Sequence, residues 1–194
     1  YSLHWYDMTT KSCGDSLSLN ITTPFETVKD FHFASCDGDH ITIVYTTVSN
    51  DIAQSVHVVM EDYDRMHMDS STPLARYKTQ TPFSSSEFSL HGIQHSRDCK
   101  FVTAYGSSGD DLIFLTPEET KSLRLQKWSM NQPFHIDSGS VYDEGTFFFV
   151  GTLSNGYGFI VKFNALKSEI EQLPFTWSSV ERTISPSQIA NTDD

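Results

Sequence analysis

A proline-phenylalanine pair occurs four times in this chain of 194 residues, at positions 24–25, 82–83, 133–134 and 174–175. The spacing between successive pairs is 58, 51 and 41 residues. Proline lacks a backbone N–H, so it belongs at the end of a strand rather than inside a sheet. The phenylalanine that follows can be buried and so fix the chain where it passes from one unit to the next. We therefore predict that each pair marks the seam between two repeated units.

Alignment on these pairs brings further features into register. A Lys-Ser dipeptide precedes three of the pairs, and short apolar runs lie upstream of it. Two of these runs are joined by Ser, Asn and Gly, which tolerate positive φ and suit hairpin turns. Another run ends in an acidic turn that contains Asp39, Asp98 or Asp143. Each unit is therefore predicted to contain four short antiparallel strands.

Consecutive four-stranded units of this length resemble the blades of a β-propeller. The segments "FVTAYGSSGDDLIFL" (residues 101–115) and "FFFVGTLSNGYGFIVKFN" (residues 147–164) are similar to the loose glycine-turn repeats of bacterial-type extracellular propellers, without WD or kelch signatures. The resemblance implies an all-β, propeller-like array of about three and a half blades, or a segment of a larger propeller. A β-sandwich of similar strands is the alternative.

The predicted divisions follow the seams. Residues 1–25 form a half blade of two strands, residues 26–83, 84–134 and 135–175 form three blades, and residues 176–194 form a partial strand and a frayed tail. The segment interpretation is favoured because Tyr1 is not a natural start. The open edge of a half blade can pair with strands of a neighbouring chain.

Composition supports β structure and excludes some partners. Fourteen Phe and eight Tyr suit pleated, half-buried surfaces. The net charge of -12 argues against nucleic acid, because phosphate binding needs clustered Lys and Arg. No run of about 18 apolar residues is present to predict a membrane-spanning segment. Protein partners or self-assembly are expected, with glycans as an alternative.

The three cysteines Cys13, Cys36 and Cys99 have no CxxC spacing, so neither a zinc site nor a thioredoxin-type motif is predicted. They are compatible with one disulfide plus a free thiol, with Cys13 and Cys36 as the candidate pair, or with three thiols in a reducing compartment. Asn20 opens an Asn-Ile-Thr sequon and is a glycosylation candidate in the secretory route. These features favour an extracellular or cell-surface protein, with a cytoplasmic one as the alternative.

Catalytic motifs are not found. There is no G-x-S-x-G elbow and no phosphate-binding glycine loop. His91 and His95 would lie about 13 Å apart on one strand face, too far to share an ion. No catalytic residue, metal or cofactor is therefore predicted. Exposed indoles can stack on sugars or partners, so the candidate binding residues are Trp5, Trp128 and Trp177.

These observations predict a non-catalytic structural or protein-interaction module that acts as a rigid propeller scaffold in an extracellular or surface assembly. Its contact sites would be the end strands and the acidic, Met-rich insert at residues 61–72. A carbohydrate-binding or glycosidase-like propeller is one alternative. An intracellular scaffold subunit is another, and it predicts three free thiols and no glycan on Asn20.

Overall fold

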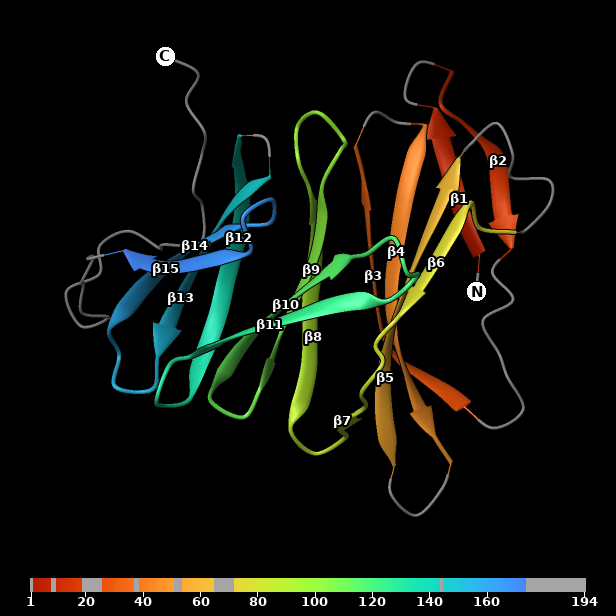
Figure 1. The fold of residues 1–194 in the computed structure, drawn as a ribbon. Helices are drawn as coiled ribbons and strands as arrows, with labels where there is room; N and C mark the ends of the chain where they lie inside the picture. Colours follow the sequence, from red (N-terminus) through yellow and green to blue (C-terminus); the bar gives the residue numbers. More distant parts are fainter. Residues whose placement is uncertain are drawn as a thin grey trace.

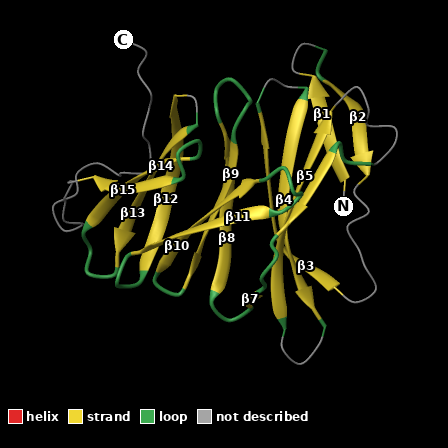
Figure 2. Cartoon of the chain, viewed as in Figure 1, coloured by secondary structure: helices red, strands yellow, loops and turns green. Residues whose placement is uncertain are grey.

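The computed structural model describes residues 2–7, 10–18, 26–36, 39–50, 54–64, 72–143 and 145–173. All regular secondary structure in these ranges is β-strand, and Figure 2 shows strands and loops but no helix. No helix that could cross a membrane is found in this described part of the chain. The all-β class predicted from the sequence is confirmed.

Three sheets follow one another along the chain, and in each sheet consecutive strands pair antiparallel. The first sheet contains β3 (Glu26–Ser35), β4 (His40–Ser49), β5 (Ser55–Asp64) and β6 (Ala75–Lys78), and the short β7 (Phe83–Ser84) also pairs with β5. The second sheet contains β8 (Phe88–His95), β9 (Val102–Ser108), β10 (Asp111–Pro117) and β11 (Leu123–Ser129). The third sheet contains β12 (Phe134–Asp143), β13 (Thr146–Leu153), β14 (Gly158–Asn164) and β15 (Glu169–Leu173). A separate hairpin pairs β1 (Ser2–Asp7) with β2 (Ser12–Ser18).

The three sheets lie side by side in sequence order (Figure 1). Their first strands are neighbours, because β3 and β12 both pack against β8. At the other edge, a bridge between Lys78 and Ser122 links the end of β6 to the start of β11. Four-stranded antiparallel sheets stacked in this way form a propeller-like array of blades, as the repeat pattern predicts.

Two proline-phenylalanine pairs lie close to the change from one sheet to the next, one at the end of the first sheet and one at the start of the third. Pro82 precedes β7, where the buried Phe83 stacks on Phe88 of the second sheet with ring centroids 4.2 Å apart. Pro133 directly precedes β12, so this pair opens the incoming strand rather than ending the outgoing one. Proline is tolerated there because the first residue of a strand need not donate to the ladder. The pairs at residues 24–25 and 174–175 lie outside the described residues.

Two apolar clusters fill the interfaces between the sheets. Between the first and second sheets the buried side chains are mainly aliphatic, among them Val44, Val56, Val58, Met60, Leu90, Ile93, Ile113 and Leu115. Between the second and third sheets they are mainly aromatic, among them Tyr105, Phe114, Phe147, Phe149, Phe159 and Phe163. Strand β4 is buried on both faces, because a third cluster of Ile41, Ile43, Tyr45, Val59 and Tyr63 lies on the opposite face of the first sheet. Such strands read as continuous apolar runs.

A β-bulge interrupts the first strand of every sheet. The pairing register jumps between Val28 and Phe31, between Leu90 and Gly92, and between Ile136 and Ser138. Each bulge contains a polar residue bonded to a hydroxyl group of the second strand: Asp30 with Thr46 (3.3 Å), His91 with Ser107 (2.9 Å) and Asp137 with Thr152 (3.0 Å). Bulges bend a strand and increase its twist, so the repeated bulge gives the three inner strands a common shape.

A disulfide joins the first two sheets. Cys36 follows β3, Cys99 lies in the loop between β8 and β9, and their Cα atoms are 5.7 Å apart. Cys13 is free and exposed. The predicted pairing of Cys13 with Cys36 is therefore wrong. Cys36 and Cys99 meet because they lie in equivalent loops of adjacent sheets, whereas Cys13 belongs to the N-terminal hairpin.

Candidate binding site on the rim

One rim of the array contains the loops that join first to second and third to fourth strands, because strand direction alternates within each sheet. Two pockets open on this rim, on either side of the loop at residues 96–101. We call the one between the first and second sheets the Asp62 pocket, and the one between the second and third sheets the Phe101 pocket. The two pockets share Lys100, Val102 and Pro117 as lining residues.

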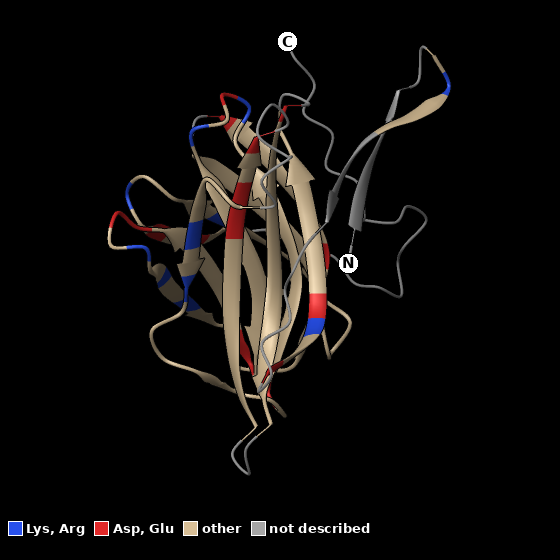
Figure 3. Ribbon diagram, turned by 90° about the vertical axis from the view of Figure 1, so that its right-hand side faces the viewer, with Lys and Arg blue, Asp and Glu red and all other residues tan. Residues whose placement is uncertain are grey.

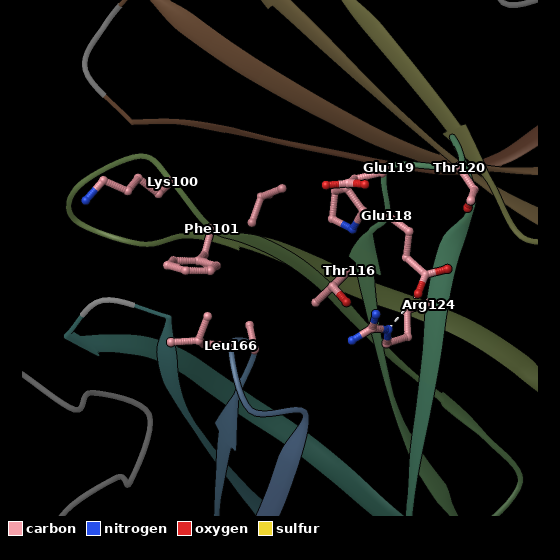
Figure 4. Close-up of a pocket in the computed structure, with 11 residues that line it drawn as sticks. Lys100, Phe101, Thr116, Glu118, Glu119, Thr120, Arg124 and Leu166 are labelled. Atoms are coloured by element: carbon pink, nitrogen blue, oxygen red, sulfur yellow. Dashed lines mark hydrogen bonds and ion pairs between the residues drawn. The ribbon is translucent and has the colours of Figure 1, made fainter.

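The Phe101 pocket has a volume of about 500 Å³. Figure 4 shows Phe101 and Leu166 on one side of it and Thr116, Glu118 and Arg124 on the other. Leu166 is 67% exposed and contributes apolar surface to the pocket. The pocket therefore combines an apolar wall with a charged, hydrogen-bonding wall.

The charged wall of the Phe101 pocket is already ordered. The carboxylate of Glu118 accepts a bond from Arg124 Nε at 2.7 Å and one from Ser122 Oγ at 3.0 Å. These bonds, that of Arg124 first, lower the pKa of Glu118. Arg124 also donates to Ser168 Oγ at 2.9 Å and so reaches across to the third sheet. This carboxylate is held ionised, so it suits recognition by charge better than proton donation.

The Asp62 pocket has a volume of about 370 Å³. Its carboxylate lies at the end of β5, where Thr42 Oγ1 donates to Asp62 Oδ1 at 2.7 Å. Burial raises the pKa of Asp62, while the Thr42 bond and the nearby His40 act in the opposite direction. Tyr77 pairs with Met60 on the neighbouring strand and also lines this pocket. Burial, and then the charge of Asp62, raise the pKa of Tyr77. Leu74, 57% exposed, is another lining residue.

The loop between the two pockets is fixed by local bonds. Ser96 Oγ donates to Asp98 Oδ1 at 2.6 Å, and Lys100 Nζ lies 2.9 Å from Asp98 Oδ2. These bonds, that of Ser96 first, lower the pKa of Asp98 to about 2. Cys99 has a φ of 61°, in the left-handed region, and is tied to Cys36. The wall that separates the pockets is therefore held by an ion pair and a covalent bond.

Of the three tryptophans predicted as binding residues, Trp128 has a described side chain, and it lines neither pocket. Trp128 lies on β11 and packs, half-buried, against the aromatic cluster. Trp5 belongs to β1, and its side chain is outside the described part of the structure. Asn20, Trp177 and residues 65–71 of the predicted insert also lie outside the described residues.

His91 and His95 both lie on β8, as the strand prediction required. Burial lowers the pKa of His91, with His135 and His32 acting in the same direction and Asp30 in the opposite one. The inner strands of all three sheets thus contribute to one electrostatic environment. Within the described ranges, no group of three or more His, Cys, Asp or Glu side chains could hold a metal ion.

The sequence pattern missed most of the pocket residues. Asp62 fell inside the insert predicted at residues 61–72, but nothing singled it out. A usable signal was present, because every second residue from Val56 to Met60 is apolar and Asp62 is the next position on that same face of β5. A carboxylate that continues an apolar row lies at the edge of a packed interface. Phe101 and Arg124 gave no such signal, since their pocket is formed by three separate loops.

Comparison with known proteins adds little to this description. No family model matches the sequence. No curated protein matches it either. Among solved structures, the chain is similar to the dihydro-heme d1 dehydrogenase NirN in complex with DHE, with 13% identity and a TM-score of 0.41 over 89% of this chain. The match covers 33% of that protein, so this chain spans about a third of its length. A likeness of this size has no bearing on function.

Proposed function

We propose that this chain is a protein-interaction module, a rigid propeller-like scaffold that binds a partner at its rim. The observation that carries the proposal is the pair of adjoining pockets on that rim. Each pocket has an exposed leucine, Leu74 or Leu166, beside charged and aromatic side chains. Interfaces commonly combine apolar anchors with a polar surround in this way.

Rigidity supports this function. Binding costs less when the surface is already ordered, because fewer side chains and loops are immobilised on association. The rim is ordered by the Cys36–Cys99 disulfide, by the bonds of Asp98 within its loop, and by the bond from Arg124 to Ser168. These bonds connect all three sheets at the level of the pockets.

The disulfide also supports an extracellular or cell-surface setting, because disulfides form and persist in oxidising compartments. Glycosylation at Asn20 remains part of the same proposal. An intact mass measured on protein from its native source, with thiol counting, tests both. One free thiol is expected. Three free thiols and an unmodified Asn20 would favour an intracellular scaffold.

Peptide and glycan arrays probed with the folded protein test the interaction role directly. We expect binding to peptides, and about tenfold weaker binding by the variants Leu166→Asp and Leu74→Asp, because a charge replaces an apolar anchor. Tyr157→Asp is the matched control. Tyr157 is 49% exposed and lies in the β13–β14 turn on the opposite rim, so its change should leave binding within about twofold.

Two results would contradict the proposal. If the Tyr157 variant lost as much peptide binding as the two leucine variants, the rim with the pockets would not be the contact surface. Binding to glycans but not to peptides, lost in the Leu74 or Leu166 variant, would support the carbohydrate-binding alternative instead.

A further inference from the structure

We propose that the Asp62 pocket receives a lysine side chain of the partner, with Asp62 as the anion that binds its ammonium group. This inference rests on the proposed function and names the chemistry of the partner. Asp62 lies where the apolar row of β5 reaches the rim, so its side chain is half-buried before any ligand arrives. A half-buried carboxylate is less screened by water and binds a cation more strongly than one at an open surface.

The carboxylate has one occupied oxygen and one open oxygen. Thr42 donates to Oδ1 at 2.7 Å, and Oδ2 forms no hydrogen bond or ion pair with the residues that the structure describes. A guanidinium group binds carboxylates best through two parallel bonds, and here the second bond would have to share Oδ1 with the Thr42 hydroxyl. An ammonium group is a point charge that one oxygen can bind. The geometry therefore favours lysine over arginine.

The remaining walls suit the alkyl stem of lysine. Leu74, Val102 and Pro117 contribute apolar surface, against which the methylene groups of a lysine can pack. Tyr77 also lines the pocket and pairs with Met60, two residues before Asp62, so its ring can contact the ammonium group through a cation–π interaction. A volume of about 370 Å³ is within the range of ligand sites and has room for a single side chain.

The charges around the pocket are compatible with a cationic ligand. Lys100 also lines the pocket, but its ammonium group is 2.9 Å from Asp98 and is neutralised there. His40 and His95 are the other titratable cations in the lining, and they would compete with lysine only when protonated. The net charge of -12 attracts a basic partner over longer distances.

The test is an NMR titration of the isotope-labelled full chain at pH 8 with N-acetyl-lysine methylamide. The norleucine and arginine analogues serve as comparison ligands. We expect the lysine compound to shift the resonances of Thr42, Asp62 and Tyr77, and to bind more tightly than either analogue. Asp62→Asn should weaken binding about tenfold or more, since it removes a charge-assisted bond. Asp137→Asn is the matched control, because Asp137 accepts a similar threonine bond in the third sheet.

A second variant tests the lysine preference independently of Asp62. Thr42→Val keeps the carboxylate and frees Oδ1, so it should retain lysine binding and strengthen arginine binding. The inference is overturned if norleucine binds as well as lysine, or if Asp62→Asn has no effect. If peptides bind the rim regardless of their lysine content, only this inference fails. If the lysine compound binds but no peptide does, the pocket chemistry stands and the protein-interaction role fails.

Discussion

The two interfaces between the sheets are built differently. The first and second sheets meet through aliphatic side chains and are joined by the Cys36–Cys99 disulfide. The second and third sheets meet through stacked rings, with no disulfide among the described residues. There Phe114 lies parallel to Phe163 with ring centroids 4.5 Å apart, and it is tilted against Phe149 at 4.9 Å.

Polar contacts also differ between the two interfaces. The first interface has a backbone bond from Lys78 N to Lys121 O at 3.3 Å, whereas the second has bonds from side-chain amides. Between the second and third sheets, Gln126 Nε2 donates to Ser168 O at 2.6 Å and Gln94 Nε2 donates to Gly139 O at 3.2 Å. Aromatic rings have preferred orientations and fewer rotamers than long aliphatic chains, so they fix how two sheets meet. Aliphatic side chains pack in more ways. We infer that the disulfide supplies to the first interface the constraint that rings supply to the second.

The largest effect is expected from Phe114→Ala. Phe114 is fully buried between two rings of the third sheet, so its removal leaves a cavity and loses both ring contacts. We expect the free energy of unfolding to fall by about 5 kcal/mol, the upper part of the range for such truncations. Chemical denaturation monitored by circular dichroism measures this loss.

Phe33→Ala is the control for that measurement. Phe33 is 57% exposed on β3, so its removal should change the free energy of unfolding by less than about 0.5 kcal/mol. Similar losses in the two variants would mean that the rings between the second and third sheets do not hold that interface together.

Removal of the disulfide by Cys36→Ser and Cys99→Ser should have the next largest effect. The bond closes a loop of 63 residues, and the chain-entropy model assigns about 4 kcal/mol to a loop of that length. Hydrogen exchange should increase first in β3, β4 and β8, next to the opened interface, and least in β13 and β14. Faster hydrogen exchange throughout the third sheet would show that the second interface also depends on the disulfide, contrary to this inference.

Much of the fold could be predicted because it depends on local signals. Turn residues and alternating apolar runs indicated four strands per unit, and Pro82 and Pro133 do lie close to the change from one sheet to the next. The need for glycine at positions 106 and 151 was not predicted. They lie inside β9 and β13, opposite the bulges, and a Cβ would come within 2.4 Å of Ser89 O or 2.2 Å of His135 O. Only the paired strand reveals that requirement.

The candidate site could not be predicted for a similar reason. The pockets are formed by loops from different sheets, and Cys36 is 63 residues from Cys99. Which cysteines meet depends on the stagger of adjacent sheets, and a repeat pattern does not specify that stagger. The hydrogen bonds of Asp30, His91 and Asp137 in the bulges were missed because a bulge shifts residues off the simple alternation of a strand.

The smallest effect concerns pH and the loop of the disulfide. The pKa of Asp98 is lowered to about 2 in the folded chain, mainly by the Ser96 bond and by Lys100. A group whose pKa is lower when folded stabilises the fold above its unfolded pKa, and the contribution is lost as pH falls through the folded value. For Asp98 that window runs from about pH 4 down to about pH 2.

Protonation of Asp98 in that window should release Lys100 and loosen the turn at Cys99. We therefore expect phosphine reduction of the Cys36–Cys99 bond to be faster at pH 2 than at pH 4, relative to Asp98→Asn, in which residue 98 is uncharged at both pH values. An equal pH dependence in both proteins would show that the disulfide alone, without the ion pair beside it, fixes the first interface at the rim.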